Sequence, residues 1–455
     1  MRKRSITRRG FLRSAGVAVA APYIVAPSAL GLQGAFAAGN RIAMGLIGCG
    51  GHGAGWNLDQ VFRCPDAQVV AVCDVDDARC EAAKARVEEH YSRAPGTEYK
   101  GCARYRDFRE LIARNDIDAV INATPDHWHV IPAIMAARAG KDVICEKPLT
   151  LTVVEGRILS DTIAQTGRVF QTASENRSID SYIRICELVR NGRIGKLQHI
   201  AVTLPGGNEN RGLTPRDFEE QPVPQGFDYD MWLGQAPWAP YCPARCHNTF
   251  RWNLDYSGGR LTDWGAHLID LAQWANDTEA TGPVEVEGIG EFPPREAVFN
   301  TATEFDINYK YANGVTMNVS STGPGIRFEG TEGWLSSSGW RGPLEASSNA
   351  ILESEIGPEE TQLYRPSEVV ARTDGGKGGE HRNFLDCVRS RKPCYAPAET
   401  GHRTITIAHL GNIAMMLGRK LRWNPAAERF DDDPEADKML SRKMREPWTL
   451  EMALK

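Results

Sequence analysis

A glycine-rich turn directly after a short apolar segment is the feature that most constrains how this chain folds. Residues 41–47 have the length and composition of a buried strand and run into the turn GCGGHG, residues 48–53. In a dinucleotide-binding βαβ unit, Gly48 permits the tight turn, Gly50 lets the backbone approach a pyrophosphate, and Gly53 lets the following helix pack closely. The pattern predicts a Rossmann-type domain whose helix N terminus faces the phosphates.

An acidic residue follows these glycines at the distance typical of a ribose-binding carboxylate. A second apolar segment, residues 68–72, ends in Cys73-Asp74, and Asp74 lies twenty-one residues after Gly53. A carboxylate there accepts hydrogen bonds from the adenosine ribose and repels a 2′-phosphate. No arginine follows it immediately. The sequence therefore predicts NAD in preference to NADP, and the alternative is that Asp74 only caps the next helix.

Strand and helix patterns keep alternating beyond this point. Residues 117–123 and 141–145 are predicted as buried strands, and residues 129–140 as the helix between them. Such alternation gives a parallel sheet, which binds ligands at the carboxyl ends of its strands. The residues predicted at these ends are Thr124, Pro125, Glu146 and Lys147, and they are assigned to the cofactor site together with the glycines, Asp74 and His129.

Three motifs in order along the chain resemble the Gfo/Idh/MocA family, the group of glucose-fructose oxidoreductase and inositol dehydrogenase. They are ATPDHWH at 123–129, GKDVICEKP at 140–148 and GGRLTDWGAHLID at 258–270. The resemblance covers almost all of the chain after residue 37. It implies an α/β fold with a Rossmann NAD-binding domain, predicted as residues 38–165. An α/β domain with a large, mostly antiparallel sheet follows, predicted as residues 166–455.

The same resemblance implies an activity and an assembly. Members of the family are NAD(P)-dependent oxidoreductases, most of which transfer hydride between the nicotinamide and a secondary alcohol of a sugar, sugar derivative or inositol. The open face of their large sheet often forms subunit contacts, so a homo-oligomer through that sheet is expected. The family also commonly has a cis proline after the lysine of its Glu-Lys-Pro motif, here Pro148.

Position by position, Lys147 matches the lysine of that motif, and Asp263 and His267 match the family's Asp-x-x-x-His pair. Oxidising an alcohol requires a base, and a histidine with an ordinary pKa of about 6.5 is a natural one. Four residues apart on a helix, Asp263 and His267 share a face, so the carboxylate is expected to orient the imidazole or hold a substrate hydroxyl. Lys147 is expected to polarise the reacting oxygen or join the proton relay. The alternative for each is a purely structural role.

Further candidates come from the predicted second domain. A strand at 167–174 leads to Glu175-Asn176-Arg177, where family members often carry a Gln-Arg pair near the nicotinamide, and this implies that Asn176 and Arg177 contact the cofactor or the substrate. Residues 205–256 are irregular and rich in proline, glycine and aromatic residues, and so long a loop is usually functional. Within it Arg251 and Trp252 are predicted to bind substrate, together with Asp263 and His267. The alternative is that the loop's aromatic rings pack the domain core.

The first 37 residues have the pattern of an export signal. Arg8-Arg9 precede an apolar run at 15–30 and the small-residue site Ala35-Phe36-Ala37, as in twin-arginine (Tat) signal peptides. The Tat translocase carries folded proteins, so the prediction is a periplasmic enzyme that takes a tightly bound cofactor with it. The alternative is an uncleaved segment that anchors the chain to the membrane.

Export bears on the reaction, because no pool of free NAD exists outside the cytoplasm. Either a second substrate reoxidises the cofactor, or the hydride returns to the same molecule. A second candidate function is therefore redox-neutral cleavage of a glycoside, as a hydrolase or lyase, through a transient keto-sugar and recycled NAD. A third is a non-catalytic sugar-binding protein. The presence of Gly48, Asp74, Lys147, Asp263 and His267 together weighs against this third candidate.

Composition excludes two classes of partner. Outside the first 37 residues the chain has 47 basic against 58 acidic side chains, which argues against nucleic acid and anionic membrane surfaces. The eleven cysteines are scattered without CxxC pairing, unlike those of a secreted disulfide scaffold. Cys242, Cys246 and His247 lack a fourth ligand at zinc spacing, so a plain loop or at most one local disulfide is expected there, and no metal site.

Overall fold

The computed structural model describes residues 38–93, 99–364 and 379–455. Contacts divide the chain into two units, Met1–Arg41 and Ile42–Lys455. The short turn Ala38–Asn40 belongs to the first unit, and every helix and strand described in this section belongs to the second. The predicted export signal lies outside the described residues. None of the helices in the described ranges combines the length and apolar character needed to cross a bilayer.

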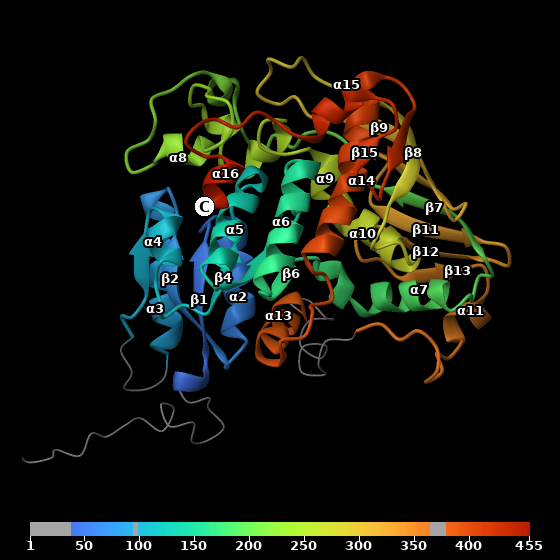
Figure 1. The fold of residues 1–455 in the computed structure, drawn as a ribbon, viewed down its shortest axis with the longest axis horizontal. Coiled ribbons are helices and arrows are strands. Elements are labelled where there is room, and N and C mark those ends of the chain that lie inside the picture. Colours follow the sequence, from blue (N-terminus) through green and yellow to red (C-terminus); the bar gives the residue numbers. More distant parts are fainter. Residues whose placement is uncertain (1–37, 94–98, 365–378) are drawn as a thin grey trace, which may run out of the picture. The chain divides into compact units, whose positions relative to one another are not determined.

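A six-stranded parallel sheet forms the first domain, in the order β3-β2-β1-β4-β5-β6 (Figure 1). This is the doubly wound order of a Rossmann fold, with its switch point between β1 and β4. The central strands read as nearly continuous apolar runs because helices cover both faces of the sheet. The strands are β1 Ile42–Ile47, β2 Ala67–Cys73, β3 Ala103–Tyr105, β4 Ala119–Asn122, β5 Asp142–Cys145 and β6 Phe170–Thr172.

The helices of this domain begin and end at residues whose side chains explain the boundaries. Asp76 caps α3 by accepting hydrogen bonds from the backbone of Ala78 and Arg79, and Thr152 caps α6. Gly167 ends α6 in the left-handed conformation, with φ 62°. The helices are α2 Leu58–Phe62, α3 Asp77–Tyr91, α4 Phe108–Ile112, α5 Val130–Arg138 and α6 Val153–Thr166, with a π-helical turn, Gly51–Asn57, before α2.

A nine-stranded, mostly antiparallel sheet forms the second domain, in the order β13-β12-β11-β7-β10-β9-β8-β14-β15. Only β7 and β10 pair in parallel. The strands are β7 Leu197–Thr203, β8 Pro283–Glu291, β9 Glu304–Tyr311, β10 Thr316–Ser320, β11 Gly325–Gly330, β12 Trp334–Ser338, β13 Leu344–Ala346, β14 Leu421–Asn424 and β15 Arg429–Phe430.

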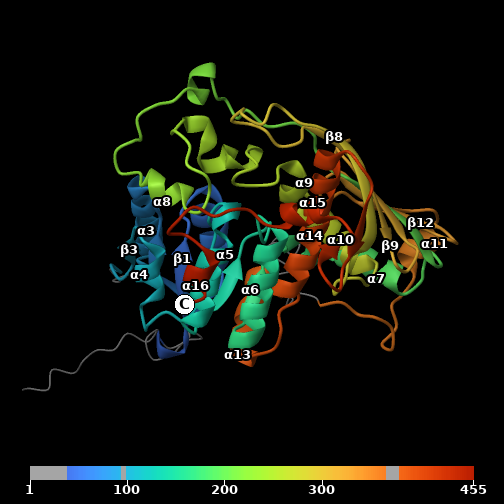
Figure 2. The same cartoon turned by 45° about the horizontal axis from the view of Figure 1, so that its top comes forward.

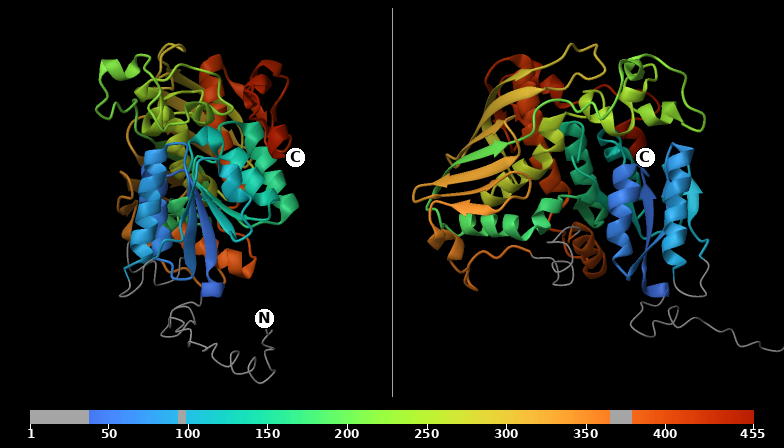
Figure 3. Two further views of the ribbon diagram at one scale, coloured as in Figure 1. Left: turned by 90° about the vertical axis from the view of Figure 1, so that its left-hand side faces the viewer. Right: turned by 180° about the vertical axis from the view of Figure 1, so that it is seen from behind.

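One face of this sheet is buried under α7 Asp180–Arg190, α10 Gly265–Ala275 and α14 Ala398–Leu417, and no helix of the described residues covers the other face (Figure 3). Strand β9 shows the division, since its residues alternate strictly between exposed and buried. Helix α14 ends at Leu417. Gly418 takes a left-handed conformation, with φ 63°, and Leu421 already begins β14.

The second half of the chain returns to the first domain. Strand β6, beyond the predicted boundary at 165, is the edge strand of the first sheet. Helix α13, Gly379–Ser390, packs its apolar side into the first domain, and so does the chain end with α16, Leu450–Ala453. Trp448 lies at 4.9 Å from Trp128 and 5.9 Å from Phe108, measured between ring centres.

Candidate active site

A cavity of about 380 Å³ opens at the carboxyl ends of β1, β2, β4 and β5. One wall comes from the first domain and the other from the irregular segment at 205–256. The sequence-predicted residues that line it are Gly48, Gly50, Gly53, Asp74, Thr124, Pro125, Glu146, Lys147 and Arg251. Residues far apart in the sequence therefore meet at the edge of the sheet where a Rossmann fold binds its dinucleotide.

The glycine turn is shaped by close backbone packing. Gly48 has φ 92°, and a Cβ atom there would lie 2.5 Å from the carbonyl oxygen of Ala123. A Cβ atom at Gly53 would lie 1.9 Å from the carbonyl oxygen of Gly48. Any side chain at either position would push the turn away from the sheet, so the turn presents bare backbone, as pyrophosphate binding requires.

Asp74 lies in the wall of the cavity, close to the glycine turn. Its carboxylate accepts hydrogen bonds from the backbone N–H of Cys49 at 2.6 Å and of Asp76 at 2.9 Å. Burial raises the pKa of Asp74 to about 6, although these hydrogen bonds oppose the rise. Asp76, not Asp74, caps the following helix, so the alternative role considered for Asp74 is not the one it has.

Two arginines that the sequence reasoning missed line the same cavity as Asp74. Arg79 is on α3, with its Nε 3.4 Å from the carboxylate of Asp76. Arg106 follows β3 and pairs with Asp77. Neither residue follows Asp74 immediately in the sequence, and only the pairing of β3 with β2 brings Arg106 close.

Glu146 ties the end of β5 to the glycine turn. Its carboxylate lies 3.0 Å from Nε2 of His52 and accepts a hydrogen bond from Asn57 at 2.9 Å. Burial opposes ionisation, but His52 and Asn57 together lower the pKa of Glu146 to about 2, and Glu146 in turn raises the pKa of His52. His52 was missed as a site residue even though it lies inside the glycine motif itself.

Lys147 of the first domain forms an ion pair with Asp263 of the second domain. Nζ of Lys147 donates to Oδ1 of Asp263 at 2.8 Å and to the carbonyl oxygen of Asp263 at 3.1 Å. Arg251 donates from Nε to the same Oδ1 at 3.3 Å. Against the effect of burial, Lys147 and then Arg251 hold the pKa of Asp263 far below its usual range. The peptide bond between Lys147 and Pro148 is cis.

His267 is buried near this pair but makes no hydrogen bond with Asp263. Asp263 ends α9, Arg260–Asp263, and His267 lies in α10, so the two do not belong to one continuous helix. Nδ1 of His267 has no hydrogen-bond partner among the described residues. Burial and the charge of Lys147 hold the pKa of His267 well below its ordinary value. The imidazole is therefore neutral, and Asp263 does not orient it.

The tip of the β12–β13 hairpin covers His267, an arrangement that no pattern in the sequence indicates. The Trp340 ring stands edge-on to His267, with ring centres 4.9 Å apart. Arg341, next in the chain at φ 58°, lies 2.8 Å from the carboxylate of Glu175 and contributes to the low pKa of His267. Burial raises the pKa of Glu175. Trp340, Arg341 and Glu175 were all missed as site residues.

Several residues predicted to bind ligand do not line the cavity, namely His129, Asn176, Arg177, Trp252, Asp263 and His267. His129 holds two strand ends together, because its ring nitrogens lie 2.6 Å from the carbonyl oxygen of Pro148 and 2.9 Å from that of Thr124. Asn176 is buried beside Arg341. Trp252 is buried as well, and its indole donates to the carbonyl oxygen of Glu209. The side chains of His129, Asn176 and Trp252 are buried behind the residues that line the cavity.

The ion pairs of Arg177 place it in the protein interior. It donates to Asp270 through Nε at 2.7 Å and Nη2 at 2.8 Å, and both side chains are fully buried. The charges of Arg177 and Asp270 are thus paired with each other, so Asp270 stabilises the packing of the helices. No group of three His, Cys, Asp or Glu side chains is placed to hold a metal ion within residues 38–93, 99–364 and 379–455.

A segment of the second domain closes over the Asp74 end of the cavity. The backbone N–H of Asp77 donates to Gly226, and that of Asp228 donates to Val75, both at 2.9 Å. Phe227, Trp232 and Phe250 of this segment line the cavity, while Tyr229, Tyr241 and Tyr256 pack beneath them. Figure 2 shows the segment, with α8 Tyr229–Leu233, beside α3. Its aromatic rings thus both line the cavity and form a local core.

A Rossmann fold with this glycine turn, an acidic residue directly after β2 and a lysine directly after β5 is typical of nicotinamide-dependent oxidoreductases. Residues 42–174 match the model described as "Oxidoreductase family, NAD-binding Rossmann fold". Residues 184–334 and 370–450 match its companion, "Oxidoreductase family, C-terminal alpha/beta domain". The chain therefore belongs to the Gfo/Idh/MocA oxidoreductase family.

Curated relatives match part of the chain. Inositol 2-dehydrogenase of Rubrobacter xylanophilus is 28% identical over 192 residues, which are 42% of this chain and 50% of the relative. Glycosyl hydrolase family 109 protein 2 of Shewanella sp. (strain ANA-3) is 32% identical over 160 residues, 35% of this chain and 34% of the relative. The chain thus spans between a third and a half of the length of these relatives.

Solved structures resemble most of the fold. Aldose-aldose oxidoreductase from Caulobacter crescentus has a TM-score of 0.59 at 16% identity, covering 84% of this chain and 99% of that one. The WlbA dehydrogenase from Bordetella pertussis, solved with NADH and UDP-GlcNAcA, has a TM-score of 0.61 at 16% identity with the same coverage. At these identities the likeness concerns the fold.

Proposed function

We propose that this protein transfers hydride between a tightly held NAD and a secondary alcohol of a sugar, sugar derivative or inositol. The observation that carries the proposal is the Lys147–Asp263 ion pair at the nicotinamide end of the cavity, with the neutral His267 nearby. The bare glycine turn and Asp74 fit the dinucleotide. When bound, NAD supplies the hydride acceptor.

In the proposed reaction, different residues of this chain stabilise the reacting oxygen and accept the hydroxyl proton. Two donors of Lys147 Nζ are used by Asp263, which leaves the third to hydrogen-bond the reacting oxygen and stabilise the charge that develops on it. Asp263 keeps Lys147 charged and in place. His267, with a free Nδ1, accepts the hydroxyl proton as general base. Arg251 is placed to bind a further substrate hydroxyl at the cavity wall.

The preference for NAD over NADP is part of the proposal. Asp74 would bind the ribose hydroxyls and repel a 2′-phosphate, whereas Arg79 and Arg106 at the same end are paired with Asp76 and Asp77. Their charges are therefore partly offset. In this proposal Asp74 determines the preference for NAD over NADP as long as its carboxyl group is ionised.

Cofactor retention is supported by the contacts around Gly226–Asp228. The two backbone hydrogen bonds to Val75 and Asp77 bind the second domain beside the Asp74 end of the cavity, so this wall must move before a nucleotide leaves. Retention suits a protein that is loaded with cofactor in the cytoplasm and exported by Tat to the periplasm, either free or membrane-anchored. We propose that location, and a homo-oligomer formed through the open sheet face.

A second candidate is redox-neutral cleavage of a glycoside through a keto-sugar. The names of the Shewanella relatives favour it, since several are called glycosyl hydrolase family 109 proteins. In that reaction the hydride returns to the same molecule, so a retained cofactor turns over many times.

The decisive experiment is native mass spectrometry for bound nucleotide, followed by a panel of sugars and glycosides. Reduced nicotinamide, by absorbance, and product are measured together at stoichiometric enzyme. NADH that accumulates in step with product and depends on added NAD indicates a conventional dehydrogenase. Sustained product with a small, constant reduced fraction indicates recycling. Absence of both bound nucleotide and turnover would leave the non-catalytic sugar-binding protein.

A further inference from the structure

A second cavity, of about 270 Å³, has no role in the proposed reaction. Among the residues that the structure describes, none lines both this cavity and the larger one. The start of α6 and one face of α14, two helices that pack side by side (Figure 1), line it together with residues near the chain end, 438–442. Sites for drug-sized ligands measure about 300–1,000 Å³, so this cavity suits a ligand the size of a single sugar.

Three cationic side chains line this second cavity, and none of its described lining residues is acidic. The cations are Arg295, Lys438 and Arg442. Neither Lys438 nor Arg442 forms an ion pair with a described residue. Nη1 of Arg442 donates to the carbonyl oxygen of Leu254, which leaves the Nε–Nη2 edge of the guanidinium without a partner among the described residues. Such an edge binds a carboxylate or phosphate through two parallel hydrogen bonds.

Carboxyl groups near these cations offset their charge only in part. Asp255 pairs with Arg295. Glu155 is buried and accepts a hydrogen bond from Oγ1 of Thr152 at 3.1 Å. Burial raises the pKa of Glu155 to about 7, although the hydrogen bond with Thr152 and the charge of Arg442 oppose the rise. Glu155 is therefore only partly charged at neutral pH, and the cavity keeps a net positive lining.

Helix α14 adds hydrogen-bond acceptors to the lining. Nδ2 of Asn412 donates to the carbonyl oxygen of Gly258 at 3.2 Å, which fixes the orientation of the amide, and its Oδ1 has no partner among the described residues. Asn412 is only 5% exposed, so an acceptor left unpaired there is costly. Nε2 of His409 lies 3.0 Å from the carbonyl oxygen of Thr150. Burial lowers the pKa of His409 to about 4, so the ring is neutral, Nε2 carries the proton and Nδ1 is an acceptor.

We propose that this second cavity binds a small hydroxylated anion, a sugar acid or a sugar phosphate, at a site separate from the proposed reaction. Lys438 and the Nε–Nη2 edge of Arg442 bind the carboxylate or phosphate. The hydroxyl groups donate to Oδ1 of Asn412 and to Nδ1 of His409. A ligand with both features matches the lining, because an anion alone leaves the acceptors unpaired and a neutral sugar leaves the cations unpaired.

Calorimetric titration of the full-length protein, saturated with NAD, tests the site with two probes, glucuronate and glucose 6-phosphate. Glucose, which lacks the charge, and acetate and inorganic phosphate, which lack the sugar hydroxyls, are the comparison compounds. At least one probe is expected to bind about ten-fold or more tightly than all three comparison compounds, since hydrogen bonds to charged groups contribute at this level. The tighter of the two probes identifies the anionic group as carboxylate or phosphate.

Variants assign the binding to the second cavity rather than to the proposed active site. Lys438→Ala and Arg442→Gln should each weaken the tighter probe about ten-fold or more. Lys443→Ala, an exposed neighbour outside the lining, is the matched control and should bind as the unmodified protein does. Arg251→Ala, in the larger cavity, should also keep its affinity.

Three results would overturn the proposal. The first is that neither probe binds, and the second is that glucose or the simple anions bind as tightly as the probes. The third is that Lys438→Ala and Arg442→Gln bind as the unmodified protein does, or that Arg251→Ala or Lys443→Ala loses as much affinity as they do.

Discussion

Lys147 and Asp263 are 116 residues apart in the sequence and lie 2.8 Å apart, Nζ to Oδ1, in the structure. Both side chains are largely buried, at 13% and 11% exposure. A buried carboxylate alone would take up a proton, but the neighbouring cations hold the pKa of Asp263 far below its usual range. The pair therefore holds a fixed, oriented ammonium group, which the proposed function assigns to the nicotinamide end of the cavity.

Replacing Lys147 by alanine removes the donor that faces the reacting oxygen. We expect turnover to fall by about 10²–10⁴-fold, the usual cost of losing a positioned proton-transfer or charge-stabilising group. NAD affinity, measured by calorimetry, is expected to change far less. Lys420→Ala, at a surface ion pair with Glu285, is the control and should keep full activity. Near-normal turnover in Lys147→Ala would remove this lysine from the mechanism.

The pH profile tests His267 through Arg341. In the proposed mechanism neutral His267 is the base, and Arg341 is one of the charges that lower its pKa. Arg341→Gln removes that charge, so the pKa of His267 rises and the base becomes protonated at a higher pH. The acid limb of the kcat/KM profile should move to higher pH, while the value of kcat/KM on the plateau at higher pH changes less. Arg327→Gln, on the sheet, is the matched control. An unmoved acid limb would show that His267 does not set it.

Cofactor choice is expected to depend on pH and on one carboxylate. The pKa of Asp74 is raised to about 6, so the residue is charged above that pH and becomes neutral below it. The preference for NAD over NADP should therefore be strongest above pH 6 and shrink as the pH falls. Asp74→Ser should relax the preference at every pH, because Arg79 and Arg106 are already present. Equal affinity of the unmodified protein for both nucleotides at pH 8 would contradict the assignment.

The N-terminal half of the site could be predicted because its signals are local. The glycine turn, Asp74 and the Glu146-Lys147 strand end are short patterns with one backbone geometry each, and all of them line the cavity. Trp340 and Arg341 gave no signal, because a hairpin tip reaches His267 only through the folding of the second sheet. Trp252 was assigned by residue type, yet burial decides the role of an aromatic ring, and this one is 1% exposed.

Asp270 follows His267 in the same motif but is expected to act on stability alone. It pairs with Arg177 inside the protein, and breaking a buried pair commonly costs about 3–5 kcal/mol because one charge is left uncompensated. Asp270→Ala should lower the free energy of unfolding by an amount of that order, measured by denaturant titration. The folded fraction should keep its KM. An increase in KM without loss of stability would instead place Asp270 at the substrate.

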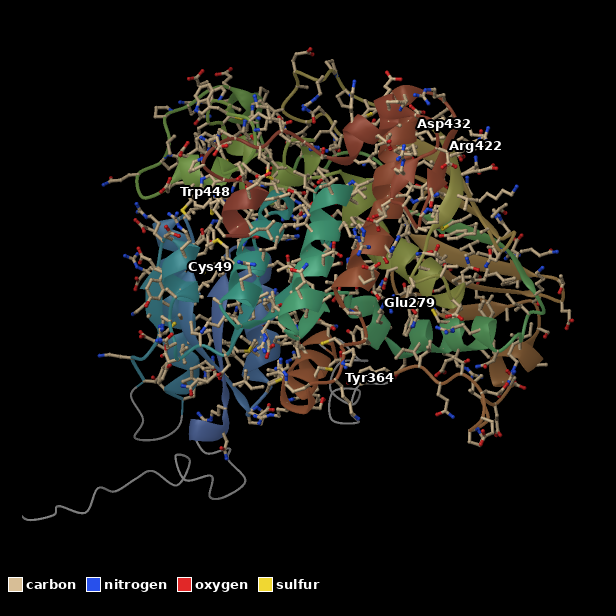
Figure 4. The ribbon with its side chains drawn as sticks, viewed as in Figure 1. Cys49, Glu279, Tyr364, Arg422, Asp432 and Trp448 are labelled. Carbon is tan, nitrogen blue, oxygen red and sulfur yellow. The ribbon has the colours of Figure 1, made fainter. Side chains whose placement is uncertain are left out.

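The chain end is predicted to control how long the cofactor stays bound. Arg445 donates to the carbonyl oxygen of Gly234 at 2.9 Å and to Asp230, holding α8 at the cavity wall. Trp448, labelled in Figure 4, packs on Trp128, whose indole donates to the carbonyl oxygen of Trp232 in α8.

Arg445→Ala and Trp448→Ala should each therefore speed NAD release about ten-fold or more, because the covering segment loses its outer support. Release is measured by chasing labelled NAD with excess unlabelled nucleotide. Arg422→Ala, at an exposed position of β14, is the control. If all three variants release NAD at the rate of the unmodified protein, the chain end does not hold the covering segment. Retention would then depend on the hydrogen bonds of Asp77 and Asp228, which a proline at position 228 would interrupt on one side.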